Sequence, residues 1–414
     1  MLEAYYKLKD CLIGHTKEVT TLATNCKRYL VSGSKDCTVK VWIVDIDGDQ
    51  PTTLYRTLKG HTNIVQEVAI TDDDKYVISG SWDGNVCIWD IESGQCIKTI
   101  KHESQIMNVS YILQPDGEFI TSLTSDGIIM IYKLFLKKDN LGMGGKDEEE
   151  EPPKFYKSCH SKEITISCST FSKSSNVQPL LCTAGSDGKI LSCFKELIKS
   201  ENTKQSCETK KSSNGNIFSF FKELIKSEST KQSCETTTGS DNEHIIETTC
   251  IEKDKMKHWR HESGGTINYI KFSPGNYYFA SGCSEGILCL WDIDGTTVLD
   301  CGNRTNSISF NPIRFICSTA NDNNTILWNI ESKTILTTIV IDDFNDINNE
   351  NKYETISNYK ERDSIAYKSQ LKEREKDSKP LIRCLSTCWF SGEIFFVACD
   401  DNTIREYKVR FDPN

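Results

Sequence analysis

A spacing that occurs seven times along the chain constrains its fold more than any other feature. The two clearest copies begin with Gly-His-Thr, at Gly14 and Gly60, and end in Asp-x5-Trp. Repeats of about 40 to 45 residues with this pattern are typical of four-stranded blades, none of which buries its faces alone. The repeat therefore predicts a closed β-propeller. The acidic and final residues of the copies are Asp36/Trp42, Asp83/Trp89, Asp126/Tyr132, Asp187/Cys193, Glu285/Trp291, Asp322/Trp328 and Asp401/Tyr407.

The distances between successive copies locate insertions and blades. The final residues are 47, 43, 61, 98, 37 and 79 residues apart, and three of these steps are too long for a period of about 43. The fold class predicted is all-β, a single seven-bladed WD-repeat β-propeller with three loop insertions, at 136–156, 196–257 and 342–379. We expect the blades near 11–48, 57–97, 100–135, 157–195, 258–297, 300–340 and 380–410, with the N-terminal strand completing the last blade.

The second insertion contains a direct duplication. The sequence FKELIKSENTKQSCET at 194–209 recurs as FKELIKSESTKQSCET at 221–236, with Asn202 replaced by Ser229. We interpret it as a tandem duplication inside a surface loop, which costs little stability. A partner-binding helix formed by FKELIKS is the alternative. The four glutamates Glu148–Glu151 of the first insertion indicate a solvated loop.

Composition narrows the classes of function. The formal net charge of -10 argues against nonspecific binding of nucleic acid, so any RNA contact needs a local basic patch. No apolar run of 18 residues and no signal peptide is visible, so we expect an intracellular protein without membrane contact. The 19 cysteines include no Cys-x-x-Cys pair and are interpreted as reduced thiols. We expect no metal and no cofactor.

The side chains that recur in the repeat predict a structural role rather than catalysis. His, Asp and Trp at the same place in each repeat are expected to form buried struts, because regular recurrence is what a packing role produces. No phosphate loop, nucleophile elbow, His-Glu-x-x-His motif or paired carboxylate is present, so we expect no enzyme. The predicted struts are His15, Asp36, Trp42, His61, Asp83, Trp89, Trp291 and Trp328, with His102, His160 and His261 read in the same way.

Several blades resemble one propeller family, of which this chain would be a divergent member. The stretch LKGHTNIVQEVAITDDDKYVISGSWDGNVCIWDIESGQ at 58–95 looks like the second blade of the receptor for activated protein kinase C, a Gβ-like protein of the eukaryotic small ribosomal subunit. The segments FASGCSEGILCLWDIDG, ISFNPIRFICSTANDNNTILWNIESK and CWFSGEIFFVACDDNTIREYKV resemble later blades of the same family. The resemblance implies a cytoplasmic, ribosome-associated scaffold that contacts ribosomal RNA and proteins and recruits protein kinases and translation factors. It implies no DNA partner.

The resemblance also implies where the chain would dock. Family members dock partly through a basic-Asp-basic turn in the first blade, and here that turn reads Lys35-Asp36-Cys37. Only the first basic position is kept. Lys40, Lys27 and Arg28 are expected to supply replacement charge for phosphate contacts. The corresponding turn of the third blade, 124–127, carries no cation.

Two other propeller functions compete with this interpretation. A β subunit of a heterotrimeric G protein would carry a long N-terminal coiled-coil helix, and 13 residues before Gly14 are too few for it. A non-ribosomal WD-repeat adaptor in signalling, ubiquitin ligation or assembly stays open as the alternative.

Overall fold

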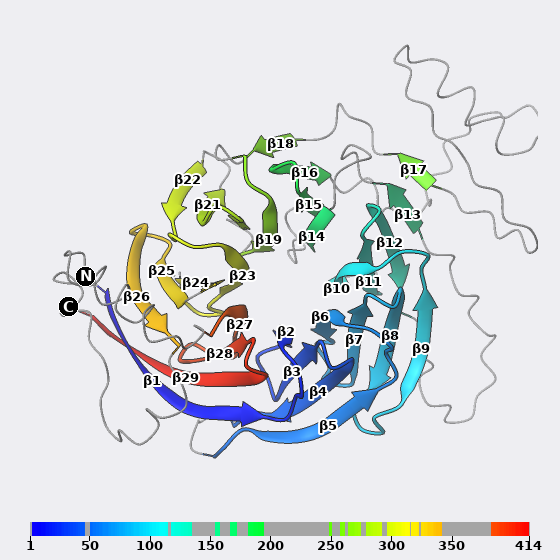
Figure 1. The fold of residues 1–414 in the computed structure, drawn as a ribbon, viewed down its shortest axis with the longest axis horizontal. Helices are drawn as coiled ribbons and strands as arrows, with labels where there is room; N and C mark the ends of the chain where they lie inside the picture. The colour runs from blue at the N-terminus through cyan, green and yellow to red at the C-terminus, as the bar shows by residue number, and fades with distance from the viewer. Residues whose placement is uncertain are drawn as a thin grey trace, which may run out of the picture. The chain divides into compact units, whose positions relative to one another are not determined.

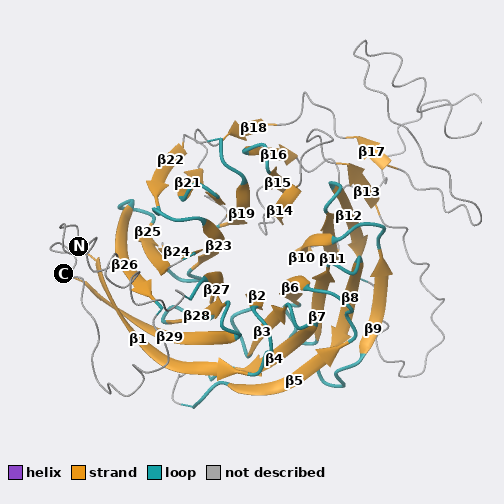
Figure 2. Cartoon of the chain, in the orientation of Figure 1, coloured by secondary structure: helices purple, strands orange, loops and turns teal. Residues whose placement is uncertain are grey.

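The computed structural model describes residues 2–45, 50–114, 117–134, 154–157, 166–171, 181–193, 248–250, 257–260, 264–274, 279–291, 296–314, 316–322, 324–341 and 382–413. All of them belong to one compact unit, formed by Met1–Lys195 and Thr248–Asn414. Every regular element among the described residues is a β-strand (Figure 2). The fold is therefore all-β, as the repeat predicts.

The described strands form seven sheets, six with four strands and one with five (Figure 1). The first sheet contains β2 (Val19–Thr24), β3 (Tyr29–Ser34), β4 (Thr38–Ile43) and β5 (Thr53–Lys59). The second contains β6 (Val65–Ile70), β7 (Tyr76–Ser81), β8 (Asn85–Asp90) and β9 (Cys96–Lys101). The third contains β10 (Ile106–Gln114), β11 (Gly117–Thr124), β12 (Ile128–Lys133), β13 (Lys154–Lys157) and β17 (Thr248–Cys250).

The remaining four sheets follow the same antiparallel order. The fourth contains β14 (Ile166–Phe171), β15 (Leu181–Gly185), β16 (Lys189–Cys193) and β18 (Lys257–Arg260), and the fifth β19 (Ile267–Phe272), β20 (Phe279–Cys283), β21 (Ile287–Trp291) and β22 (Thr296–Asp300). The sixth contains β23 (Thr305–Phe310), β24 (Ile316–Asn321), β25 (Asn324–Asn329) and β26 (Thr334–Val340). The seventh contains β27 (Cys384–Trp389), β28 (Ile394–Cys399), β29 (Thr403–Pro413) and β1 (Leu2–Ile13).

The first strands of the sheets contact one another in sequence. β2 contacts β6, and the series continues through β10, β14, β19 and β23 to β27, which contacts β2 again. The N-terminal strand β1 pairs with the C-terminal strand β29 over their whole length, from Leu2↔Pro413 to Ile13↔Thr403. The two ends of the chain therefore share the seventh sheet, as expected from the sequence (Figure 1).

Glycines explain how closely neighbouring sheets pack. A Cβ atom added at Gly33 of β3 would lie 2.7 Å from Cγ1 of Val65 in the next sheet, and one at Gly80 of β7 would lie 2.5 Å from Cγ2 of Ile106. Real Cβ contacts are never this short, so the Ser-Gly-Ser of the repeat lets the next first strand approach.

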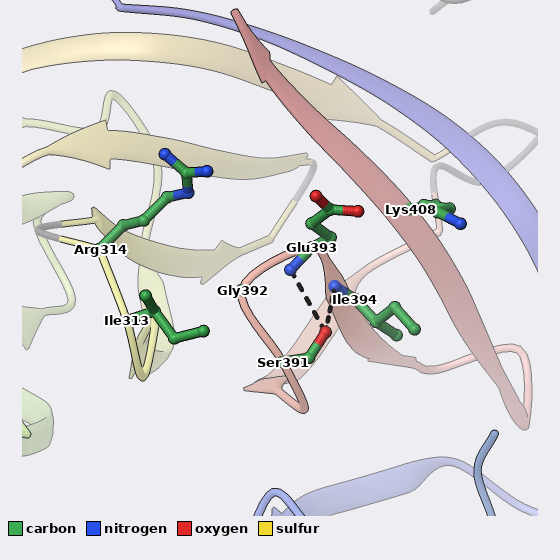
Figure 3. Close-up of a pocket in the computed structure, with 7 residues that line it drawn as sticks. All are labelled: Ile313, Arg314, Ser391, Gly392, Glu393, Ile394 and Lys408. Carbon is green, nitrogen blue, oxygen red and sulfur yellow. Dashed lines mark hydrogen bonds between the residues drawn. The ribbon is translucent and has the colours of Figure 1, made fainter. Parts of the chain in front are cut away.

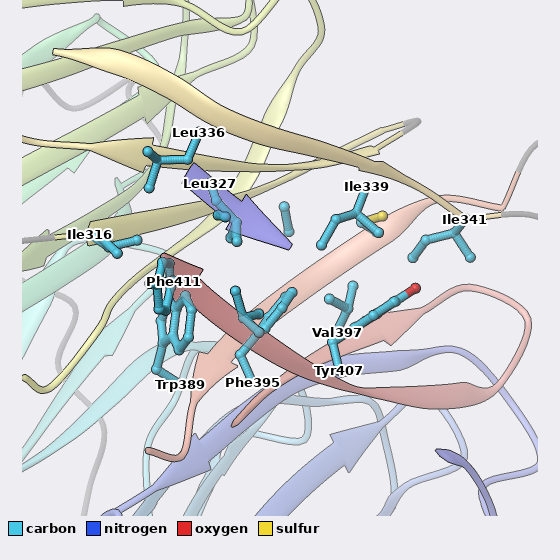
Figure 4. Packing of buried hydrophobic residues seen from close by; sticks show 14 of the residues in the cluster. Ile316, Leu327, Leu336, Ile339, Ile341, Trp389, Phe395, Val397, Tyr407 and Phe411 are labelled. Atoms are coloured by element: carbon cyan, nitrogen blue, oxygen red, sulfur yellow. The ribbon is translucent and has the colours of Figure 1, made fainter. Parts of the chain in front are cut away.

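Apolar side chains fill the space between sheets. In the largest cluster, residues of the sixth sheet pack against residues of the seventh (Figure 4). On the side of the seventh sheet, Trp389, Phe395 and Tyr407 form a row, with ring centroids 4.9 Å apart for Trp389–Phe395 and 5.2 Å for Phe395–Tyr407. Further apolar clusters lie between other neighbouring sheets, as expected for repeats that do not bury their faces alone.

Two features differ from the expected layout. The last strand of each sheet precedes the next repeat, so β5 ends inside the segment expected to begin the second blade at residue 57. The second insertion is not wholly loop, because β17 pairs in parallel with β13 at the outer edge of the third sheet. β13 likewise begins inside the first expected insertion, at Lys154, and β18 begins at Lys257, the last residue of the second. The remaining residues of the three insertions, together with His160 and His261, lie outside the described residues, and the domain boundaries stay predictions.

Candidate functional site

The predicted docking residue Lys35 begins a tight turn between β3 and β4. The Cys37 N–H donates to the Ser34 carbonyl at 3.2 Å, and the Asp36 N–H donates to Ser34 Oγ at 3.0 Å. Asp36 Oδ1 accepts from the Thr38 N–H at 2.9 Å and from its hydroxyl at 2.6 Å. These bonds fix the turn backbone, so Lys35 projects from a rigid base.

A series of hydrogen bonds between buried side chains links this turn to the first sheet. Asp36 Oδ2 lies 2.9 Å from His15 Nδ1, and His15 Nε2 lies 2.8 Å from Ser32 Oγ. The Trp42 indole N–H donates to the same Ser32 Oγ at 2.9 Å. The arrangement fits a neutral imidazole that donates from Nδ1 and accepts at Nε2.

The ionisation of this network follows from its surroundings. Burial lowers the pKa of His15, although the hydrogen bond and charge of Asp36 oppose the effect. Burial alone would raise the pKa of Asp36, but hydrogen bonds from His15, Thr38 and the Thr16 N–H hold it well below its usual range. Near neutral pH the pair is therefore a neutral histidine beside a carboxylate, which suits a structural role.

The second sheet repeats the arrangement. His61 Nδ1 lies 2.9 Å from Asp83 Oδ2 and His61 Nε2 lies 2.7 Å from Ser79 Oγ, to which the Trp89 indole donates at 2.8 Å. Elsewhere only parts of the network remain among the described residues. Trp291 donates to Ser281 at 2.7 Å, Trp328 to Thr319 at 3.3 Å, and His102 Nε2 lies 2.9 Å from Ser122 Oγ.

Lys35 already has an anionic neighbour. Its Nζ lies 2.5 Å from Glu18 Oε2, and the two side chains are 39% and 28% exposed. A surface pair of this kind contributes little stability. Lys35 can therefore exchange the Glu18 carboxylate for a phosphate at small cost.

Two of the predicted docking residues lie at the other end of β3. Lys27 and Arg28 belong to the turn between β2 and β3, whereas Lys35 follows β3. The six residues of β3 separate them, which at the usual rise corresponds to about 20 Å. Lys27 Nζ donates to the Asp72 carbonyl, and the Arg28 guanidinium lies 5.2 Å from the Tyr29 ring centre. Lys27 and Arg28 therefore lie apart from the Lys35 turn, and their predicted role in docking is untested.

Lys40 is not a surface residue. It is 7% exposed, and its Nζ donates to Thr57 Oγ1 at 2.9 Å inside the first sheet. Burial lowers the pKa of Lys40, with Asp36 acting in the opposite direction. Its ammonium group is thus engaged by Thr57, and its predicted contact with phosphate is untested.

Two cations beside Lys35 were missed from the sequence. Lys17 is exposed, and its backbone carbonyl accepts from the hydroxyl of Ser34, the residue before Lys35, at 3.0 Å. Arg383, which precedes β27, pairs with Asp400 through Nε at 2.8 Å and is influenced by the Glu18 charge. We group Lys17, Lys35 and Arg383 as the Lys35 surface, which also carries the carboxylates of Glu18 and Asp400. Only the spatial neighbourhood of the first and seventh sheets reveals Arg383.

A small cavity lies between turns of the sixth and seventh sheets (Figure 3). Its volume is about 220 Å³, and Ile313, Arg314, Glu393, Ile394 and Lys408 are among its lining residues. Ligand sites usually enclose about 300 to 1,000 Å³, and Ile313 at its rim is 78% exposed. The cavity is therefore too small and too open for a typical small-molecule site.

Within the described ranges, no group of three or more His, Cys, Asp or Glu side chains could hold a metal ion. The same part of the chain contains no helix long and apolar enough to cross a membrane.

Comparison with known proteins identifies the repeats. The family model described as WD40, WD domain, G-beta repeat, matches residues 6–42, 52–90, 94–133 and 254–292. Together with the sheets described above, these matches show an all-β WD40 β-propeller.

Three relatives match shorter segments. The chain is 40% identical over 86 residues to the small ribosomal subunit protein RACK1 of Dictyostelium discoideum, covering 20% of this chain and 26% of that protein. It is 38% identical over 101 residues to the small ribosomal subunit protein RACK1 of Caenorhabditis elegans, covering 23% and 31%. It is 33% identical over 123 residues to pre-mRNA-processing factor 19 of Oryza sativa subsp. japonica, covering 29% and 23%. The chain spans less than a third of the length of each of these relatives.

Proposed function

We propose that this chain is a non-catalytic scaffold of the small ribosomal subunit. It contacts ribosomal RNA and neighbouring proteins at the subunit head and recruits signalling or translation factors, including protein kinases, in the cytoplasm. The observation that carries the proposal is the 40% and 38% identity to two small ribosomal subunit proteins. The scaffold is a seven-bladed propeller, a count supported by the seven sheets whose first strands contact in cyclic order.

Docking uses the Lys35 surface. Lys17, Lys35 and Arg383 offer three cationic side chains at one end of the first and seventh sheets, and the His15–Asp36 network holds the central turn in place. Phosphate contacts of this kind position a protein on RNA without reading its sequence. Because the formal net charge is -10, RNA binding would depend on such local cations and not on the charge of the whole surface.

The second candidate is a non-ribosomal WD-repeat adaptor. The similarity to pre-mRNA-processing factor 19 of Oryza sativa favours it, since that match is the longest of the three at 123 residues. Such an adaptor would present the same propeller to a different assembly and would have no need of phosphate contacts at Lys35.

Sedimentation of native extract through a sucrose gradient separates the two candidates. The ribosomal scaffold comigrates with small subunits, including after a moderate salt wash. Migration as a free protein at low salt, or with nuclear pre-mRNA complexes alone, would overturn the ribosomal proposal.

A further inference from the structure

Two cysteines on neighbouring strands of the second sheet contact the same hydroxyl group. Cys87 Sγ in β8 lies 3.8 Å from Thr99 Oγ1, and Cys96 Sγ in β9 lies 3.4 Å from the same atom. Both are free thiols, and Cys96 is exposed whereas Cys87 is buried. An accessible sulfur and an enclosed sulfur therefore share one hydroxyl group as their neighbour.

A β-bulge places Cys96 on this face of the sheet. The pairing of β8 with β9 runs through Cys87↔Thr99 and Ile88↔Lys98, and then shifts to Trp89↔Cys96. Without the shift, Ile97 would oppose Trp89, and Cys96 would point to the other face, because successive side chains alternate. The extra residue therefore brings Cys96 to the face that carries Cys87 and Thr99.

The first sheet has the same bulge without sulfur. There the pairing shifts from Val41↔Arg56 to Trp42↔Leu54. Lys40 takes the place of Cys87 and donates to Thr57 Oγ1 at 2.9 Å, while Leu54 takes the place of Cys96. The backbone arrangement thus belongs to the repeat, whereas the thiol pair belongs to the second sheet.

We propose that Cys87 and Cys96 are a reversible dithiol–disulfide site that a small oxidant of the peroxide class converts to a disulfide joining β8 and β9. The peroxide oxidises the exposed Cys96 thiol to a sulfenic acid and leaves as water. The Cys87 sulfur then attacks the Cys96 sulfur, the S–S bond forms, the S–O bond breaks and a second water leaves. Two thiols and one peroxide give one disulfide and two waters, and a thiol reductant reverses the change.

The environment of Cys87 sets the pH dependence of the second step. Burial, together with the adjacent Cys96, raises the pKa of Cys87 to about 12. Asp83 acts in the same direction, and the Thr99 hydroxyl opposes it. Since the thiolate is the attacking species, the disulfide forms faster as the pH rises from neutrality.

The test uses the purified full-length chain, treated with hydrogen peroxide and then alkylated. Trypsin leaves both cysteines in one peptide, because no Lys or Arg lies between Lys75 and Lys98. A protease that cleaves after Asp and Glu separates them at Asp90 or Glu92. We expect a peptide pair linked between Cys87 and Cys96 in the unreduced digest, its loss after reduction, and its faster appearance at higher pH.

Variants make the result specific. Cys96→Ser is expected to lose the linked peptide completely, and Cys87→Ser to leave Cys96 as a sulfenic or more oxidised acid. Cys26→Ser, which removes another exposed thiol, keeps the link. Oxidation of Cys96 in the unmodified chain without a link to Cys87, or a link from Cys96 to a different cysteine, would overturn the proposal.

Discussion

At the scale of single residues, Cys37 adopts a backbone conformation that most side chains avoid. Its φ is 67°, and glycine occupies the same turn position in four other sheets. A left-handed conformation costs a residue with a Cβ about 1 to 2 kcal/mol. We predict that Cys37→Gly raises the free energy of unfolding by about 0.5 to 1 kcal/mol. The backbone strain that the substitution removes is larger than the additional conformational entropy that glycine loses on folding. Chemical denaturation measures the change. The corresponding glycines are Gly84, Gly127, Gly188 and Gly286.

The reverse substitution in the second sheet is the matched control. Gly84 has a φ of 80°, and a Cβ there would lie 2.8 Å from the His102 carbonyl oxygen. Gly84→Ala should therefore lower stability by more than 1 kcal/mol, by about the cost of the strained conformation. A stabilising Cys37→Gly together with a destabilising Gly84→Ala would support this explanation of the turn conformation. A destabilising Cys37→Gly would contradict it.

The strut network predicts a pH dependence of stability. Because the pKa of His15 is lowered on folding, the unfolded chain binds its proton more readily, and stability falls as the pH drops below about 6.5. The pKa of Asp36 is also lowered, so its contribution is present above about pH 4 and is lost as the pH falls further. Asp36→Asn should flatten the dependence of the melting temperature on pH below about 4. An unchanged slope in that range would count against the network.

At the scale of elements, an ion pair with a buried carboxylate of β29 stabilises the position of β1. Glu406 of β29 is fully buried; it accepts from Lys9 Nζ at 2.8 Å and from the Thr52 hydroxyl at 2.8 Å. Lys9→Met leaves this charge without its cation, which typically costs about 3 to 5 kcal/mol. Lys7→Met on the same strand removes an exposed charge and should change stability by less than about 0.5 kcal/mol. Thermal denaturation of both variants checks the difference, and equal effects would contradict a role of the Lys9–Glu406 pair in holding β1.

The elements themselves were largely predictable, whereas the site was not. The fixed spacing of Gly-His and Asp-x5-Trp gave the strand pairs and the shared seventh sheet, because alternating burial imposes that pattern on every repeat. Around Lys35, closeness in the sequence does not correspond to closeness on the surface. Lys27 and Arg28 are close in sequence but a whole strand away, and Lys40 faces inward because of its position in β4. The insertion strand β17 carries no periodic signal in its three residues.

At the scale of the whole molecule, hydroxyl groups of the first strands bridge adjacent sheets. Ser386 Oγ accepts from the Leu22 N–H at 3.2 Å across the junction of the seventh and first sheets, and Ser307 Oγ accepts from the Thr387 N–H at 3.4 Å. At the next junction the Thr21 hydroxyl donates to Glu67 Oε1 at 3.0 Å. Such bridges satisfy polar groups between sheets and fix how the sheets are spaced.

Glu67 makes this junction sensitive to pH. Burial raises its pKa from 4.5 to about 7, with Lys271 and the Thr21 hydroxyl opposing the shift. The folded state therefore retains a proton that the unfolded chain releases, and the stabilisation is lost as the pH rises through 7. Glu67→Gln keeps the acceptor for Thr21 and cannot ionise. We predict that it is more stable than the unmodified chain at pH 8 and that this advantage shrinks toward pH 5, as measured by denaturant midpoints. A constant difference would refute the assignment.

A binding titration with purified small ribosomal subunits tests whether the Lys35 surface docks this propeller on the subunit. Lys35→Glu should weaken binding about tenfold, or about 1.4 kcal/mol, and lower the slope of log affinity against log salt by about 1. Lys27→Glu, at the opposite end of β3, is the charge-matched control and should bind like the unmodified chain. Unchanged binding of Lys35→Glu, or an equal loss in both variants, would contradict docking through this surface.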